Sequence, residues 1–273
     1  MSESAIAVAA AEGNPLSSEV FQLNPHPEVR NLRVGRGHHR VVVVDDFYLH
    51  PERIVPFIDR MSFVDDRRRG LALPVSRAVV RLELGKVLAA VRAYARESRL
   101  RNVAEEWFVV QGMWGNTPLK PHQRLPHTDP AIAAYVYLNQ PKDCSGGTAL
   151  YRHRPTGLEL IPFTADKHMV QLALDFGYPP LQEGRRTRNY VEMVQRVVFH
   201  PRQANPDGSM LNDGNRYWEL MLLLEMRFNR LIIHDGRIPH TAYIPPGSFE
   251  EVPRLMQMLS IEFDESLWPG ERA

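Results

Sequence analysis

Two imidazole side chains and one carboxylate in this sequence have the types and spacing needed to bind a metal ion. His127 and Asp129 are separated by one residue, and His240 lies far downstream. Alternate residues of an extended segment point to the same side, so we expect His127 and Asp129 to reach the same ion. Two histidines and one carboxylate form the ligand set of non-haem iron(II) sites with open coordination positions. These three residues are therefore the candidate metal ligands.

The same residues also have less specific interpretations. A His-x-Asp pattern is expected by chance about half a time in a chain of this composition. His127 could be a surface loop histidine and Asp129 a turn aspartate, since a motif match is only a hypothesis. His234 competes with His240 because it lies at the end of the predicted strand Leu231–His234, shortly before His240. The residues alone therefore leave both the site and its second histidine open.

The composition favours a soluble cytoplasmic protein. The 273 residues are 44% hydrophobic, enough for a sizeable core, and the formal net charge is +1. This balance provides no global field to attract nucleic acid or an anionic membrane, so we expect neither as a partner. Cys144 is the one cysteine, which excludes an internal disulfide and fits a reducing compartment. We recognise no signal peptide and no membrane-spanning stretch, and a homodimer is compatible with these properties.

Short apolar segments separated by turn residues predict a mainly β structure of the sandwich or barrel type. Residues 1–25 are expected to form a flexible tail, with structured sequence from about Arg40. Two helices with apolar stripes are predicted, one from Pro51 and one between Gly85 and Leu100. The predicted strands are Val41–Val44, Trp107–Gln111, Ala131–Leu138, Gly147–Tyr151, Glu219–Leu224, Leu231–His234 and Leu255–Phe263.

One long segment interrupts this pattern. Residues 154–217 are polar and contain several prolines and glycines, which predicts an irregular insertion in a single domain of residues 26–273. Long loops of this kind are often lids or binding loops. The preceding run Tyr151-Arg152-His153-Arg154 could meet an anionic substrate at a barrel mouth, although solvated surface is the favoured interpretation. The pair Gly146-Gly147 predicts a tight turn before a strand.

The order of these motifs resembles that of the iron(II)- and 2-oxoglutarate-dependent oxygenases, nearest to their prolyl-hydroxylase-like branch. The motifs are His127-Thr128-Asp129, the strand Tyr135–Asn139, the turn Gly146-Gly147-Thr148, the step Phe228-Asn229-Arg230 before a strand, His240 and Arg254. The resemblance implies a mainly β (α+β) fold, a distorted double-stranded β-helix or jelly roll with flanking N-terminal helices. It also implies that His127, Asp129 and His240 bind Fe(II). Arg254 would pair with the distal carboxylate of 2-oxoglutarate, a task that suits a guanidinium.

The resemblance also implies a reaction. A dioxygenase of this kind would hydroxylate a small-molecule or amino-acid-type substrate and release succinate and carbon dioxide. Asp129 favours hydroxylation over halogenation, since halogenating members have a small residue in place of the carboxylate. Both histidines must be neutral to bind, so metal affinity is expected to fall below roughly pH 6.

This sequence departs from the family pattern in two places, and alternatives stay open. The gap between Asp129 and His240 is long, and Met256 stands where some members have a serine two residues after the arginine. A cupin-like metal-binding protein that is not an oxygenase is the main alternative, because the same ligands suit zinc. A barrel that binds its ligand without a metal is a third.

Overall fold

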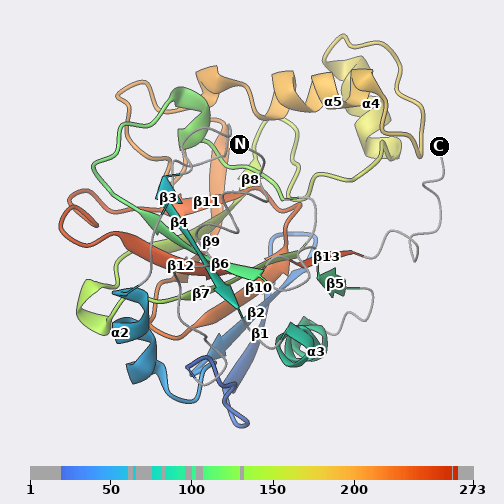
Figure 1. The fold of residues 1–273 in the computed structure, drawn as a ribbon. Helices are drawn as coiled ribbons and strands as arrows, with labels where there is room; N and C mark the ends of the chain where they lie inside the picture. The colour runs from blue at the N-terminus through green and yellow to red at the C-terminus, as the bar shows by residue number, and fades with distance from the viewer. Residues whose placement is uncertain are drawn as a thin grey trace.

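A large antiparallel sheet forms the centre of the structure (Figure 1). The computed structural model describes residues 20–60, 64–65, 76–81, 84–95, 100–102, 107–129, 132–259 and 261–263. Within these ranges the main sheet has the strand order β1-β2-β10-β7-β12-β6-β4-β3. Its strands are β1 (Glu28–Val34), β2 (His39–Asp45), β3 (Val64–Asp65), β4 (Ser76–Arg81), β6 (Trp107–Met113), β7 (Ile132–Tyr137), β10 (Leu231–Asp235) and β12 (Arg254–Met258). The prediction of a mainly β fold is confirmed.

Two smaller sheets complete the described strands. One has the order β11-β8-β9, formed by β8 (Gly147–His153), β9 (Trp218–Glu225) and β11 (His240–Tyr243). The other pairs β5 (Leu100–Asn102) with β13 (Ile261–Phe263). Gly146 shows why a glycine must precede β8: its φ is +61°, and a Cβ there would lie 2.1 Å from the carbonyl oxygen of Tyr243. The predicted positive φ of a glycine before this strand is therefore confirmed.

Side chains alternate between the two faces of the main sheet, and each face has its own core. Val42, Val44 and Ile233 belong to an outer cluster that includes the buried faces of α2 (Ile54–Ile58) and α3 (Leu84–Ala95). The inner cluster joins the main sheet to the smaller sheet β11-β8-β9. Its members include Val41, Val43, Tyr135, Tyr137 and Ile232 from the main sheet, and Leu150, Leu224 and Ala242 from the smaller one. The two sheets therefore pack on each other as a sandwich.

Most of the predicted strands and both predicted helices are confirmed, but one predicted strand is divided and several strands were missed. The predicted strand Leu255–Phe263 is two strands, because the chain leaves the main sheet after Leu259 bonds to Ala134 and joins β5. The strands that were not predicted are β1, β3, β4, β5 and β11. Ala131, which began a predicted strand, and Met61, which ended a predicted helical stripe, lie outside the described residues.

Ordered structure begins before the predicted start at Arg40. Strand β1 precedes that residue, and its side chains are mostly exposed, so it lacks the apolar alternation that marks a strand. Phe21, within the predicted tail, is 4% exposed and meets Tyr48 and Phe57 edge to face. Residues 1–19, the rest of that tail, lie outside the described residues.

The segment 154–217 is more ordered than the sequence indicated. It contains α4 (Lys167–Asp175), α5 (Arg188–Met193), a π-helical turn at Val194–Val198 and a short 3₁₀ turn at Pro201–Gln203. These helices lie at the opposite end of the molecule from α2 and α3 (Figure 1). Their apolar residues share a third cluster with Tyr151 of β8 and Trp218 of β9. The prediction of an irregular loop was therefore wrong, because tertiary packing onto these two strands supports short helices.

Shorter turns connect the remaining elements. They are 3₁₀ turns at Pro51–Arg53, Pro121–Arg124 and Pro141–Asp143. In the part of the chain that the structure describes, no helix is both long and apolar enough to cross a membrane.

Candidate metal site

Backbone pairing brings the two predicted histidine ligands together. His127 and His240 form an isolated antiparallel bridge, in which each amide donates to the other residue's carbonyl at 2.9 Å. Their ring centroids are 4.5 Å apart. Asp129 is held by its own amide, which donates to the carbonyl of Gly236 at 2.8 Å in the turn after β10. Backbone hydrogen bonds on both sides of the site thus hold Asp129 and His240 close together, although they are far apart along the chain.

The donor atoms of the three side chains could share one ion. One ligand atom from each of His127, Asp129 and His240 lies within 4.8 Å of the other two. His240 donates through Nδ1 to the carbonyl of Ile238 at 2.8 Å, the arrangement typical of a metal-binding histidine. His240 Nε2 then faces Asp129 Oδ2 at 3.3 Å. Two lone pairs at this distance repel each other unless a proton or a metal cation lies between them, so the donor set fits a metal.

The protonation states of the site also suit a metal. Burial, with a contribution from the charge of His240, lowers the pKa of His127 to about 4. Burial alone would raise the pKa of Asp129, but the polar contact with His240 and the electrostatic effect of the neighbouring histidines hold it below its usual range. At neutral pH His127 is therefore neutral and Asp129 ionised. The expected loss of metal affinity below roughly pH 6 stays a prediction.

His234, the rival histidine, lies beside the site but outside the group that could share an ion. Its ring centroid is 4.7 Å from that of His240, at an interplanar angle of 77°. Its Nδ1 lies 2.8 Å from the carbonyl oxygen of Asp235, and its Nε2 lies 3.4 Å from the hydroxyl of Tyr135. Both ring nitrogens of His234 are engaged in this way, so the structure places His240 in the cluster instead.

Arg254 is a buried cation at the start of β12. It is 2% exposed, and its Nη2 lies 3.1 Å from the carbonyl of Gly147 and 3.3 Å from Oγ1 of Thr148. Its guanidinium carbon lies 5.4 Å from the ring centroid of Tyr137, whose hydroxyl donates to the same Thr148 Oγ1 at 2.8 Å. Within the described residues no carboxylate pairs with Arg254, and its Nε has no hydrogen-bond partner. A buried charge without a counter-ion is costly, so the site suits an anionic ligand.

Tyr135 connects the metal cluster with Arg254. Burial raises the pKa of its phenol well above the usual value, and the charges of both Arg254 and Asp129 also act on it. Sequence analysis did not assign a role to Tyr135, Tyr137 or Thr148. The signal was present for the tyrosines, because alternate residues of a strand share a face and Tyr135-Val136-Tyr137 lies directly after the His-x-Asp motif.

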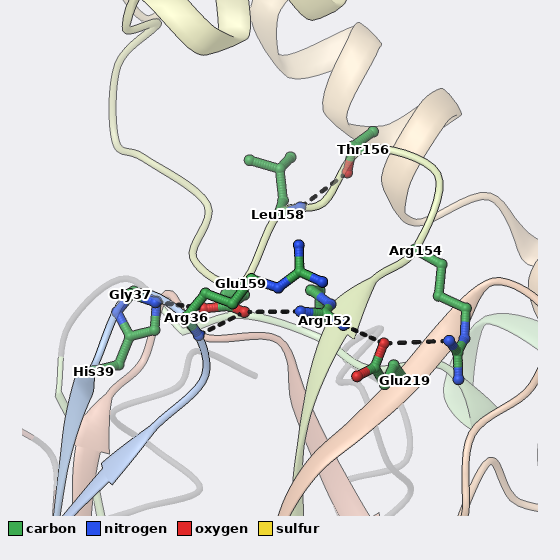
Figure 2. A network of polar contacts seen from close by, with 9 residues as sticks. All are labelled: Arg36, Gly37, His39, Arg152, Arg154, Thr156, Leu158, Glu159 and Glu219. Carbon is green, nitrogen blue, oxygen red and sulfur yellow. Dashed lines mark hydrogen bonds and ion pairs between the residues drawn. The ribbon is translucent and has the colours of Figure 1, made fainter.

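The run Tyr151–Arg154 is solvated surface only in part, because Arg154 is exposed while two of its other residues are buried. Tyr151 and His153 are fully buried. Arg152 pairs with Glu159 and Glu219, and Arg154 pairs with Glu219 at 3.2 Å (Figure 2). These carboxylates neutralise the arginines. The shared partner of both arginines, Glu219, lies more than sixty residues further along the chain, so the run alone did not reveal it.

Glu159 fastens the segment 154–217 to the β1–β2 turn. Its carboxylate accepts backbone hydrogen bonds from Arg36 at 3.0 Å and Gly37 at 2.9 Å, and His39 Nε2 lies 3.3 Å away. Figure 2 shows Glu159 between this turn and Arg152. Burial alone would raise the pKa of Glu159, but these two amides, His39 and Arg152 hold it below its usual value. The contact is structural, and it fixes the segment against the strands.

Comparison with known proteins adds one finding. No curated protein matches the chain. The model of a family of unknown function, DUF6445, matches residues 25–191, which is more than half of the sequence. The matched region contains His127 and Asp129, while His240 and Arg254 lie beyond it. The chain therefore belongs to the DUF6445 family.

Proposed function

We propose that this protein is an iron(II)- and 2-oxoglutarate-dependent dioxygenase that hydroxylates a small-molecule or amino-acid-type substrate. The observation that carries the proposal is the pairing of two sites in one interior. A His-Asp-His group suited to a divalent metal lies near a buried arginine that lacks a carboxylate among the described residues. A chain of contacts connects the two sites: the guanidinium of Arg254 lies 5.4 Å from the ring of Tyr137, whose centroid lies 5.8 Å from that of Tyr135. Tyr135 in turn contacts His234, whose ring packs against His240, which supports one small ligand contacting both sites.

The strand order supports a distorted jelly roll as the finer description of the fold. The chain passes from β6 in the main sheet to the His127 bridge on β11, back to β7 in the main sheet, and then to β8 in the smaller sheet. The next strand, β9, stays in the smaller sheet, and the chain then alternates again, with β10 in the main sheet, β11 in the smaller and β12 in the main. This winding is what a double-stranded β-helix requires. It would place all three metal ligands at one end of the sandwich.

Different residues of this chain would bind the iron and the 2-oxoglutarate. His127, Asp129 and His240 would hold the iron, and Arg254 would bind the distal carboxylate of 2-oxoglutarate through charge-assisted hydrogen bonds. When bound, iron(II) and 2-oxoglutarate supply oxidative decarboxylation, which consumes oxygen, yields succinate and carbon dioxide, and hydroxylates a C–H bond. The hydroxyl of Thr148, which already contacts Arg254, is placed to orient the carboxylate. The apolar side chains of the inner cluster would exclude water around it.

An anaerobic titration tests the proposal. We expect iron(II) followed by 2-oxoglutarate to produce the weak visible charge-transfer band of the chelate, and we expect His240→Ala to abolish it. His122→Ala is the matched control, because His122 is an exposed histidine of the loop that leads to the site. An unchanged band in His240→Ala would refute the ligand assignment.

Turnover separates the proposal from its main alternative. The same ligands suit zinc in a cupin-like protein that is not an oxygenase. On admission of air, the dioxygenase is expected to convert 2-oxoglutarate to succinate, even slowly without its primary substrate. A protein that binds metal tightly but forms no succinate beyond the metal-free control would favour the alternative.

A further inference from the structure

The hydrogen bonds of His234 determine which of its nitrogens carries the proton. Its Nδ1 lies 2.8 Å from the carbonyl oxygen of Asp235, and a carbonyl can only accept, so Nδ1 carries the hydrogen. The ring is buried at 1% exposure, which disfavours its charged form. Nε2 therefore offers a lone pair. The Tyr135 hydroxyl, 3.4 Å away, must be the donor of that hydrogen bond.

His240 is held between two other imidazole rings. The centroid of His127 lies 4.5 Å from that of His240 on one side, and the centroid of His234 lies 4.7 Å away with its ring edge-on. His127 is already fixed by the backbone bridge. The ring of His234 is fixed by its two hydrogen bonds, and one of these comes from a neighbouring strand of the main sheet, since β7 pairs with β10. The ring of His240 therefore packs against a His234 ring whose position depends on the Tyr135–His234 hydrogen bond.

We propose that Tyr135 and His234 are positioning residues of the metal centre. Their hydrogen bond fixes the His234 ring, which in turn keeps the His240 ring turned so that Nε2 faces Asp129 Oδ2. This inference rests on the proposed function, because it requires a metal at the His-Asp-His group. It assigns a role in metal binding to two residues that make no contact with the metal themselves.

Tyr137 provides a matched control on the same strand. Like Tyr135 it is a buried tyrosine of β7 on the inner face, but its hydroxyl donates to Thr148 beside Arg254 rather than to a histidine. Tyr135→Phe and Tyr137→Phe each remove one buried hydroxyl and keep the ring. A general loss of packing or stability should therefore affect both variants alike, whereas a positioning role at the metal should appear only in Tyr135→Phe.

The experiment uses cobalt(II) as the metal probe, titrated into the full-length protein and followed by its visible spectrum. We expect Tyr135→Phe to weaken cobalt binding about 10- to 100-fold, the usual effect of losing such a supporting hydrogen bond, and to shift the cobalt bands. Tyr137→Phe should keep the wild-type cobalt affinity and bands, and should weaken the binding of 2-oxoglutarate to the cobalt-loaded protein. His234→Leu should match Tyr135→Phe. The double variant should bind cobalt no more weakly than either single variant, because both break one interaction.

The outcomes separate this inference from the proposed function. Wild-type protein that binds no cobalt would overturn both. Cobalt binding to the wild type with unchanged affinity and bands in Tyr135→Phe would overturn only the positioning role. If Tyr135→Phe does not fold, His234→Gln, which keeps a polar side chain of similar size, is measured in its place. Wild-type affinity and bands in that variant would contradict the inference in the same way.

Discussion

Replacing Arg254 by methionine should stabilise the ligand-free protein and abolish its response to 2-oxoglutarate. In the ligand-free state Arg254 donates to Gly147 and Thr148, and such bonds contribute about 1 kcal/mol each. Against them stands the burial of a cation without a carboxylate partner among the described residues, which costs several kcal/mol. The net effect of Arg254→Met on the free energy of unfolding is therefore between about 0 and +3 kcal/mol.

The ligand reverses this balance. A carboxylate paired with Arg254 gains charge-assisted hydrogen bonds of about 1.5–3 kcal/mol each, so losing two of them weakens 2-oxoglutarate binding about 100-fold or more. At a concentration one hundred times its Kd, 2-oxoglutarate should stabilise the wild-type protein by about 2.7 kcal/mol. That corresponds to a rise in Tm of several degrees for a chain of this size. The same concentration should leave the Tm of the variant almost unchanged.

The assay is thermal unfolding of the manganese-loaded protein with and without 2-oxoglutarate. Arg230→Met is the control, because it also removes a largely buried arginine but leaves its partner, the buried Asp45, with fewer counter-charges. It should destabilise the protein by a few kcal/mol and keep the response to 2-oxoglutarate. The reasoning about Arg254 is refuted if Arg254→Met melts several degrees below the wild type and is still stabilised by 2-oxoglutarate, since the guanidinium would then be a structural group.

Three further predictions concern the stability of the fold. Burial lowers the pKa of His153 to about 4, so the unfolded chain binds a proton at low pH that the folded protein does not bind, and stability is lost as pH falls from 6.5 to 4. At about 1.4 kcal/mol per pH unit the loss is about 3 kcal/mol. In urea unfolding the stability of His153→Asn should depend less steeply on pH than that of the wild type, and an equal slope would contradict the assignment. Glu159→Ala removes the acceptor of two backbone amides and should lower the free energy of unfolding by about 2 kcal/mol. The freed amides of Arg36 and Gly37 should exchange hydrogen faster. Unchanged exchange at both amides would refute the role of Glu159 in fastening the turn. Asn229 has φ +62°, and its side chain hydrogen-bonds both the amide and the carbonyl of Tyr48. Asn229→Gly loses these two bonds and should lower the free energy of unfolding by about 2 kcal/mol, and Asn229→Ala should lower it by about 1 kcal/mol more because alanine disfavours positive φ. Equal losses for the two variants in urea unfolding would contradict the role of the positive φ.

The sequence predicted elements whose signals are local. The β-branched run Val41–Val44 identifies β2, because a strand that is covered on both faces has a continuous apolar pattern. The stripe that includes Val87 and Val91 identifies α3 for the corresponding reason. In both, the pattern of side chains along a short window is itself the cause of the structure.

Elements that depend on distant partners were missed. Strand β11 has only four residues and follows a proline, and it exists because it pairs with β8. Helix α4 has a cap, since the Asp166 carboxylate accepts from the Met169 amide, and apolar residues at helical spacing. The surrounding prolines and glycines nevertheless predicted an irregular segment. The helix forms because its apolar face packs on residues of β8 and β9, which a local window of sequence does not contain.

The candidate site also combines residues with local sequence signals and residues whose roles depend on distant contacts. The types and spacing of His127 and Asp129 were visible in the sequence, and the resemblance pointed to His240 and Arg254. The choice between His240 and His234 needed the backbone bridge to His127, which joins residues far apart along the chain. The roles of Tyr135 and Thr148 depend on contacts between strands of two sheets, so no single window of sequence contains them.

The most direct test of the proposed iron and 2-oxoglutarate sites is a crystal structure of the protein grown without oxygen in the presence of manganese(II) and 2-oxoglutarate. We expect an anomalous peak bound by His127, Asp129 and His240, with the distal carboxylate of 2-oxoglutarate on Arg254. Manganese bound elsewhere, or 2-oxoglutarate with its distal carboxylate away from Arg254, would contradict the proposal.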